Sequence, residues 1–167
     1  MTRVKSRLLG QLLFICAAAG GVASTVTAAD SAPLNATISF TETIALPGKS
    51  CDGDGKIAGT GVVPRLGKVT LQSTDCITGT VPGFTFASTE FRLIAANGDA
   101  LIGTYGGAFT LDPVTGVGTI MGGFTIFSGT GRLANAKGGG FVTGTEQVDL
   151  STFTGQGQLQ LNGTISY

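Results

Sequence analysis

The sequence contains no histidine and no tryptophan, and only 12% of its residues are charged. Without histidine the chain cannot build a site in which an imidazole activates a serine or cysteine nucleophile. The same absence argues against a haem or zinc site, because imidazole is a preferred ligand of these metals. We therefore predict no cofactor and no bound metal. Acid–base chemistry would depend on carboxyl groups, whose pKa rises when they are buried among apolar side chains.

The first 29 residues differ in composition from the rest of the chain. They begin with a short basic region formed by Arg3, Lys5 and Arg7. Residues 8–19 are apolar and residues 20–29 are small and weakly polar. This order is typical of a secretory signal peptide, which we expect to be cleaved near Ala28 or Ala29.

The competing interpretation of this segment is a membrane anchor. A spanning helix needs about 20 mostly apolar residues, whereas this run is interrupted by Gln11 and then by Gly20 and Gly21. No stop-transfer charges follow it. We expect no stable membrane span, and a secreted or periplasmic protein in which residues 30–167 form a single domain.

Basic residues are scarce once the signal peptide is removed. Residues 30–167 contain seven basic and ten acidic residues, a net charge of −3. Nucleic-acid binding normally needs a basic patch that displaces counterions from phosphates. The remaining lysines and arginines form no such cluster, so we exclude a nucleic-acid partner.

Cysteine is also scarce, with three residues in the chain. Cys16 lies in the signal segment, which leaves Cys51 and Cys76 as a pair in an oxidising compartment. We predict that they form a disulfide, since two cysteines alone make a poor zinc site. The acidic segment after Cys51 does not match a calcium-binding EF-hand loop, because Lys56 and Val63 fall where oxygen ligands belong.

Helical periodicity is absent after the signal segment, and glycine and period-2 alternation of apolar residues are abundant. The predicted strands cover residues 35–45, 56–63, 67–73, 83–95, 101–111, 118–127, 139–148 and 153–166. Seven Gly-Thr pairs occur at irregular spacing, and glycines inside strands allow the bends that a small closed barrel requires. The sequence therefore predicts an all-β fold, an eight-stranded antiparallel closed barrel, rather than a sandwich.

Residues 124–138 carry a more specific pattern. Its motif residues are Gly129, Thr130, Gly131, Leu133, Ala136 and Gly138. This pattern resembles the signature of the dirigent and allene oxide cyclase-like barrels, which include secreted bacterial members; Ser128 replaces the first glycine of their motif. The turn at residues 96–99 is also similar to that family's.

The resemblance covers the second half of the chain well and the first half only by the number of strands. It implies a barrel of the calycin or allene oxide cyclase type, with a homo-oligomer as an option, and no particular activity. The residues themselves indicate a structural role for the motif. Gly131 and its neighbours permit a positive φ angle at a turn, and Leu133 then folds over the end of the barrel. A phosphate loop would need a helix N-terminus and a lysine.

Four charged residues are candidates for catalysis, and strand alternation nominates each of them. Glu42 shares a face with apolar side chains of the strand 35–45, and Glu146 does so in the strand 139–148. Glu90 and Arg92 share a face of the strand 83–95. The simpler interpretation is that Glu42 and Glu146 are solvated, near a strand end and a turn, and that Glu90 and Arg92 form a surface ion pair.

The strand 83–95 contains an inconsistency in its alternation. Phe86 has the same parity as Glu90, whereas Phe91 and Leu93 have the opposite parity. A β-bulge near Ser88 would place all these apolar side chains inside, and would change the face on which Glu90 lies.

Three functions stay open. The first is a secreted barrel that binds a small apolar ligand in its mouth, or an extracellular partner. The second is an isomerase-like or cyclase-like enzyme, similar to the cyclases and dirigent proteins, that steers a reactive intermediate with help from a buried carboxylate. The third is a purely structural protein. An open cavity containing a carboxylate would favour the first two, and a barrel filled by Phe and Leu with all acids outside would favour the third.

Overall fold

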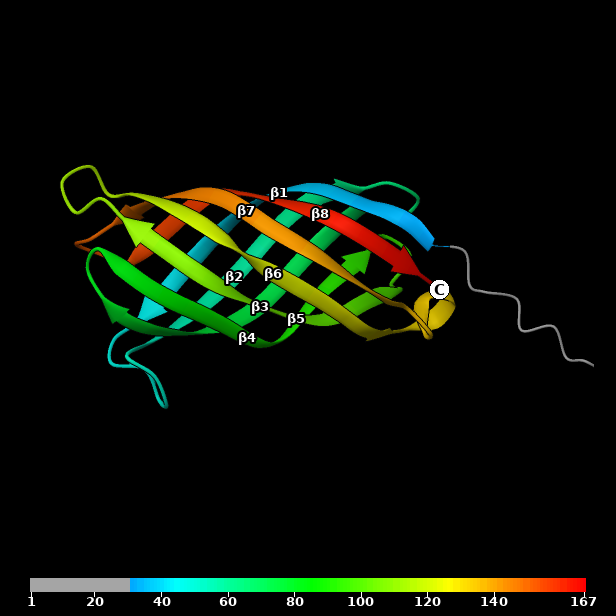
Figure 1. Cartoon of the computed structure of the whole chain (residues 1–167), viewed down its shortest axis with the longest axis horizontal. Helices are drawn as coiled ribbons and strands as arrows, with labels where there is room; N and C mark the ends of the chain where they lie inside the picture. The colour runs from blue at the N-terminus through cyan, green and yellow to red at the C-terminus, as the bar shows by residue number, and fades with distance from the viewer. Residues whose placement is uncertain (1–30) are drawn as a thin grey trace, which may run out of the picture.

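The computed structural model describes residues 31–167, so the signal peptide predicted for residues 1–29 lies outside the described residues. Eight strands and one short 3-10 helix make up the fold (Figure 1). They are β1 (Ser31–Ala45), β2 (Gly53–Val63), β3 (Gly67–Thr80), β4 (Gly83–Ala95), β5 (Ala100–Leu111), β6 (Val117–Gly129), η1 (Gly131–Leu133), β7 (Lys137–Asp149) and β8 (Thr154–Ser166).

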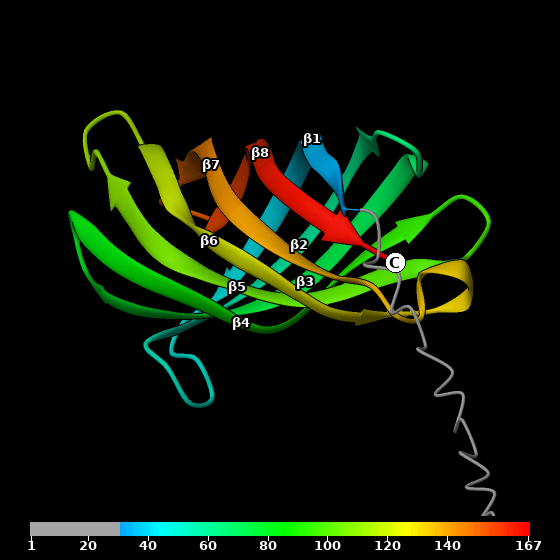
Figure 2. The same ribbon diagram turned by 45° about the vertical axis from the view of Figure 1, so that its right-hand side comes forward.

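Each strand pairs antiparallel with the next, and β1 pairs with β8 to close the barrel. The predicted fold class is therefore confirmed. All eight predicted strands are present, with the largest difference in β3, which continues past Ser73 to Thr80. Strands on the front wall cross those on the back wall at an angle (Figures 1 and 2), as closure of a barrel requires.

No helix within residues 31–167 is long and apolar enough to span a membrane.

Alternation of side chains separates the interior of the barrel from its surface. In β1, residues from Ala32 to Glu42 alternate between buried and exposed, with apolar side chains on the buried face. The exposed face of β1 and β8 consists mainly of uncharged threonine, serine, glutamine and asparagine. This pattern specifies the register, because a slip of one residue would expose the whole apolar face.

One half of the barrel is filled by side chains. The most deeply buried include Leu34, Val63, Leu93, Leu101 and Ile126. These residues lie near the ends of their strands on the side of η1 and the C-terminus (Figure 1). Close packing of aliphatic side chains therefore closes this end.

The motif at residues 129–138 completes that closed end. Gly131 adopts a positive φ of 57°, which favours glycine. Leu133 follows in η1 and is 3% exposed, packed in the core as predicted. The Thr130 hydroxyl accepts a hydrogen bond of 2.9 Å from the backbone N–H of Ala100. The Arg132 guanidinium donates one of 2.8 Å to Asp99, so the motif is joined to the turn between β4 and β5.

A covalent link lies beside the opposite end of the barrel. The predicted disulfide between Cys51 and Cys76 is present, with a Cα–Cα distance of 5.6 Å. It ties the β1–β2 loop to β3 beside the turns that follow β1 and β3. Asp52 strengthens the same connection, because its carboxylate accepts a hydrogen bond of 2.9 Å from the backbone N–H of Gly79.

Candidate ligand-binding site inside the barrel

A cavity of about 430 Å³ occupies the half of the barrel away from η1. Its walls are mostly apolar and include the aromatic rings of Phe40, Phe84, Phe86, Phe91, Phe109 and Phe124. Side chains from three turns lie at its mouth: Leu46, Val81, Leu150 and Phe153.

Besides Asp52 and Thr80 near the turns, four polar residues line this cavity, and each comes from a different odd-numbered strand. They are Glu42 on β1, Asp75 on β3, Tyr105 on β5 and Glu146 on β7. The three carboxylates belong to residues no more than 7% exposed. Buried acids in an apolar cavity are the arrangement expected at a binding or catalytic site.

Glu42 and Glu146 are brought together across β8. Glu42 pairs in register with Gly155, and Glu146 pairs with Gly157, on opposite sides of that strand. Because Gly155 has no side chain, the Glu146 carboxyl can extend over β8 towards β1. The Glu146 carboxyl occupies the space where a Cβ of Gly155 would lie, and the Glu42 carboxyl does the same over Gly55 of β2.

The environment of this pair favours its protonated forms. Burial raises the pKa of both carboxyl groups, and the neighbouring negative charges of Glu146 and Asp75 raise the pKa of Glu42 further. Two carboxylates in one low-dielectric space cannot both ionise without a large electrostatic cost. The pair therefore titrates as a unit that retains a proton above the usual range for glutamate.

Asp75 and Tyr105 form a second polar pair beside the first. The Tyr105 hydroxyl donates a short hydrogen bond to Asp75 Oδ1, and the Ser73 hydroxyl donates one of 3.3 Å to the same atom. Burial raises the pKa of Asp75 to about 6, although both donors oppose that shift. The ring of Tyr105 packs against Phe91 and Phe86, with centroids 5.6 Å and 6.0 Å away, so its hydroxyl is held in place.

Among solved structures, the barrel is similar to the pterocarpan synthase dirigent protein GePTS1. The TM-score is 0.50 at 13% sequence identity, and the similar region covers 86% of this chain and 94% of that chain. The chain has a dirigent-like barrel fold. At this identity the likeness establishes the fold alone. No protein-family model matches the sequence, and no curated protein matches it.

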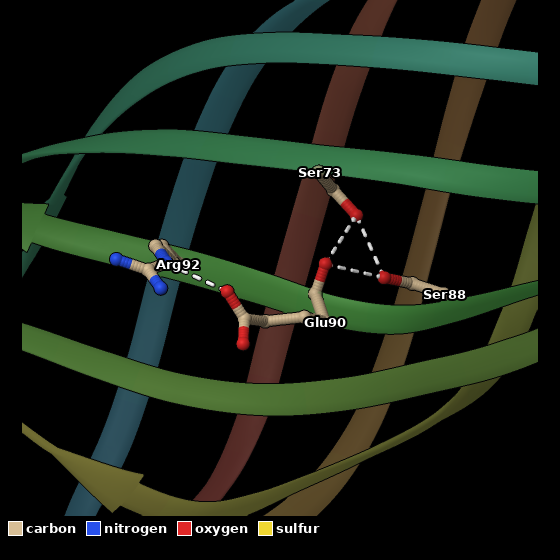
Figure 3. Close-up of polar contacts among 4 residues, drawn as sticks. All are labelled: Ser73, Ser88, Glu90 and Arg92. Carbon is tan, nitrogen blue, oxygen red and sulfur yellow. Dashed lines mark hydrogen bonds and ion pairs between the residues drawn. The ribbon is translucent and has the colours of Figure 1, made fainter.

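The dirigent-like barrel places the other two candidate residues outside the cavity. The Arg92 guanidinium donates a hydrogen bond of 2.7 Å to Glu90, and both side chains are about half exposed, at 48% and 47% (Figure 3). They form the surface ion pair of the simpler interpretation. The interpretation that Glu42 and Glu146 are solvated is wrong, because they are 7% and 5% exposed. In both strands the alternation of inward and outward side chains continues to the strand end, and it places these glutamates inside.

A β-bulge explains why Glu90 faces outward. The register of β4 against β5 shifts between Ser88 and Phe91, which confirms the bulge predicted near Ser88. The Ser88 hydroxyl donates to the carbonyl oxygen of Glu90 at 2.8 Å and lies 2.8 Å from the Ser73 hydroxyl (Figure 3). The Ser88 hydroxyl thus satisfies the backbone where the ladder is interrupted.

Two polar groups of the dirigent-like barrel's cavity were not predicted from the sequence, Asp75 and Tyr105. The predicted third strand ended at Ser73, so Asp75 lay outside every predicted strand. Extending the alternation of Leu71 and Ser73 by one step would have placed Asp75 on the inner face. The contact between Asp75 and Tyr105 joins residues 30 positions apart, and nothing local in the sequence indicates it.

Proposed function

We propose that this protein binds a small, largely apolar molecule inside the barrel. The observation that carries the proposal is a 430 Å³ cavity with apolar walls and a few inward polar groups. Cavities of roughly 300 to 1,000 Å³ with this composition are typical of small-molecule sites. The aromatic walls would provide most of the binding energy, and the polar groups would fix the ligand's orientation.

A purely structural role fits this geometry less well. A structural barrel gains stability from a filled interior, and an unfilled apolar space forfeits packing energy. Burying carboxyl groups beside one another adds a further cost. These costs are reasonable where a ligand offsets them, and they have no evident purpose in a protein that only needs to be stable.

A second candidate function is catalysis of proton transfer on the bound molecule. It is favoured by Glu42 and Glu146, whose shared environment can hold one group protonated while the other is ionised. Such a pair can act as general acid and general base on a single substrate. The dirigent-like neighbour is a pterocarpan synthase by name, which supports a cyclase-like or isomerase-like activity as the form that this catalysis would take.

The proposal places the protein outside the cytoplasm. The signal peptide predicted for residues 1–29 would be removed, and residues 30–167 would form the mature domain. The disulfide between Cys51 and Cys76 supports an oxidising compartment. A homo-oligomer of the mature domain stays a prediction.

Native mass spectrometry of the secreted protein tests the proposal. We expect a chain that begins at Ala29 or Asp30, holds one disulfide and carries a co-purified small molecule that is lost on activation in the gas phase. Val142→Trp would fill the cavity, since Val142 is 3% exposed and lines it. Val62→Trp is the matched control, because Val62 is 60% exposed on the outer surface. Loss of the ligand in both folded variants, or in neither, would contradict binding inside the barrel.

A further inference from the structure

Among the fully buried side-chain oxygen and nitrogen atoms of residues 31–167, one has no hydrogen-bond partner. It is Oε1 of Glu146, which is fully buried in a residue that is 5% exposed and lines the cavity. Asp75, by contrast, accepts hydrogen bonds from both Tyr105 and Ser73. An unpaired buried acceptor is unfavourable, and more so when it is charged. A ligand that donates a hydrogen bond to the Glu146 carboxyl would offset this cost.

The charges around the cavity all have one sign. Four acidic residues line it, Glu42, Asp52, Asp75 and Glu146, and none of the described lining residues is lysine or arginine. The Tyr105 hydroxyl could donate a hydrogen bond to a ligand, but it already donates to Asp75. The cavity therefore offers acceptors and negative charge, and it lacks a group that would neutralise a bound anion.

We propose that the ligand carries a basic nitrogen, and that its ammonium group lies between Glu42 and Glu146 while its apolar body fills the space among the phenylalanine rings. This inference rests on the proposed function and names its ligand class. An ammonium group has several N–H donors and no acceptor. It can therefore donate to the carboxyl groups of Glu146 and Glu42 at the same time.

The electrostatics of the two glutamates favour a cation over a neutral or anionic group. Without a ligand the pair must retain a proton to avoid two adjacent negative charges. A cation placed between them allows both groups to ionise, because it replaces the missing positive partner of a buried charge. A carboxylate ligand would add a further negative charge to a cavity whose described lining has no positively charged side chain, so we expect it to bind weakly.

The pH dependence of amine binding follows from the groups that face the site. These are Glu42 from β1, Asp75 from β3, Tyr105 from β5 and Glu146 from β7, with Asp52 at the mouth. None of the even-numbered strands contributes a titratable side chain to the described lining. Amine binding should weaken as the carboxyl groups become protonated at low pH. It should also release protons from the glutamate pair, whereas binding of a neutral analogue should not.

Three probes with one apolar body test the inference: 1-naphthylmethylamine, 1-naphthalenemethanol and 1-naphthoic acid. Their affinities are measured by isothermal titration calorimetry at pH 7, in two buffers that differ in ionisation enthalpy so that proton release is also measured. We expect the amine to bind at least about tenfold more tightly than the alcohol, which corresponds to roughly 1.4 kcal/mol. The acid should bind most weakly.

The outcomes separate this inference from the proposed function. If the alcohol binds as tightly as the amine, the inference is overturned and binding inside the barrel stands. If none of the three probes binds, both are contradicted. In the folded variants Glu146→Gln and Glu42→Gln, the preference for the amine should fall at least about fivefold while alcohol affinity is kept. Glu90→Gln, which removes an acid on the outer surface, should leave the preference unchanged, and an equal loss there would overturn the inference.

Discussion

The carboxyl group of Glu146 lies directly over Gly155, the residue of β8 that pairs with Glu42 on the other side. A glycine thus provides the space in which two acidic side chains from separate strands approach each other. The same type of residue has a different role at another position between β7 and β8. There Gly140 and Gly163 face each other, and a Cβ on either would overlap the backbone of the opposite strand.

Alanine substitutions should distinguish these two roles. In Gly155→Ala the new methyl group meets the movable end of Glu146, so we expect a folded barrel in which the Glu146 carboxyl is displaced and the pKa of Glu42 falls. In Gly140→Ala the methyl group meets the carbonyl of Asn162, and we expect a loss of roughly 3 kcal/mol or more. Carboxyl ¹³C titration by NMR and urea denaturation measure the two effects. A Gly155→Ala protein that retains the wild-type titration would show that the carboxyl position does not matter.

Stability should fall as the pH rises from about 4 to neutrality. The pKa values of Glu42, Asp75 and Glu146 are raised in the folded state, chiefly by burial. At any pH between the ordinary pKa values of these acids in the unfolded chain and their raised values in the folded state, the folded protein therefore binds more protons than the unfolded chain. Each excess proton costs roughly 1.4 kcal/mol of stability per pH unit. The loss from Asp75 is complete above about pH 6, where its folded-state pKa lies, and that from the glutamates continues at higher pH.

Urea denaturation from pH 4 to pH 9 measures this slope, and the double variant Glu42→Gln/Glu146→Gln should flatten its upper part. The carboxyls of Asp99, which is partly buried, and of the exposed Asp112 and Asp149 have lowered pKa values because they accept hydrogen bonds. They act in the opposite sense and only at acidic pH, so they do not mask the effect. A wild-type protein whose stability increases from pH 5 to pH 8 would contradict the burial of these acids.

Tyr105→Phe should destabilise the protein more at pH 8 than at pH 5. The Tyr105 hydroxyl lowers the pKa of Asp75 by hydrogen bonding to its ionised form. Without that donor the buried carboxylate is left with Ser73, at a cost of roughly 1 to 3 kcal/mol. At pH 5 Asp75 is mostly protonated and the cost is smaller. Chemical denaturation at both pH values tests this, with Phe91→Leu as a packing control whose effect should not depend on pH.

Ser88→Ala should cost more stability than Glu90→Gln, although the two residues are near neighbours. The Ser88 hydroxyl is buried and contacts both Ser73 and the carbonyl oxygen of Glu90. Its loss leaves part of the bulge unsatisfied, at roughly 1 to 2 kcal/mol. The Glu90–Arg92 ion pair is half exposed and should contribute less than about 1 kcal/mol. Equal losses in thermal denaturation would mean that the bulge does not depend on its hydroxyls.

Removal of the disulfide should destabilise the mouth of the barrel. Cys51 and Cys76 are separated by 25 residues, and closure of a loop of this length stabilises a fold by roughly 3 to 4 kcal/mol on the chain-entropy model. We expect the double variant Cys51→Ser/Cys76→Ser to lose about that amount in urea denaturation. The wild-type protein measured with a reductant is the matched control. A loss below about 1 kcal/mol would indicate an unfolded state that is already constrained.

The architecture of this protein was predictable because it depends on local patterns. Period-2 alternation, as in residues 35–45, identifies a strand and its buried face without knowledge of its neighbours. The parity conflict between Phe86 and Phe91 even located the bulge. The disulfide followed from composition, since only one pair of cysteines remains after Cys16.

The composition of the cavity was decided by tertiary structure. Alternation placed Glu42 and Glu146 on apolar faces, but the sequence does not show that β1 and β7 flank the same strand, or that this strand presents glycines at Gly155 and Gly157. The pairing of Asp75 with Tyr105 depends in the same way on β4, whose Ser88 pairs in register with both residues. Strand alternation is a property of a few consecutive residues, whereas the shift in a carboxyl group's pKa is set by burial and by charges on other strands, which only closure of the sheet brings within reach.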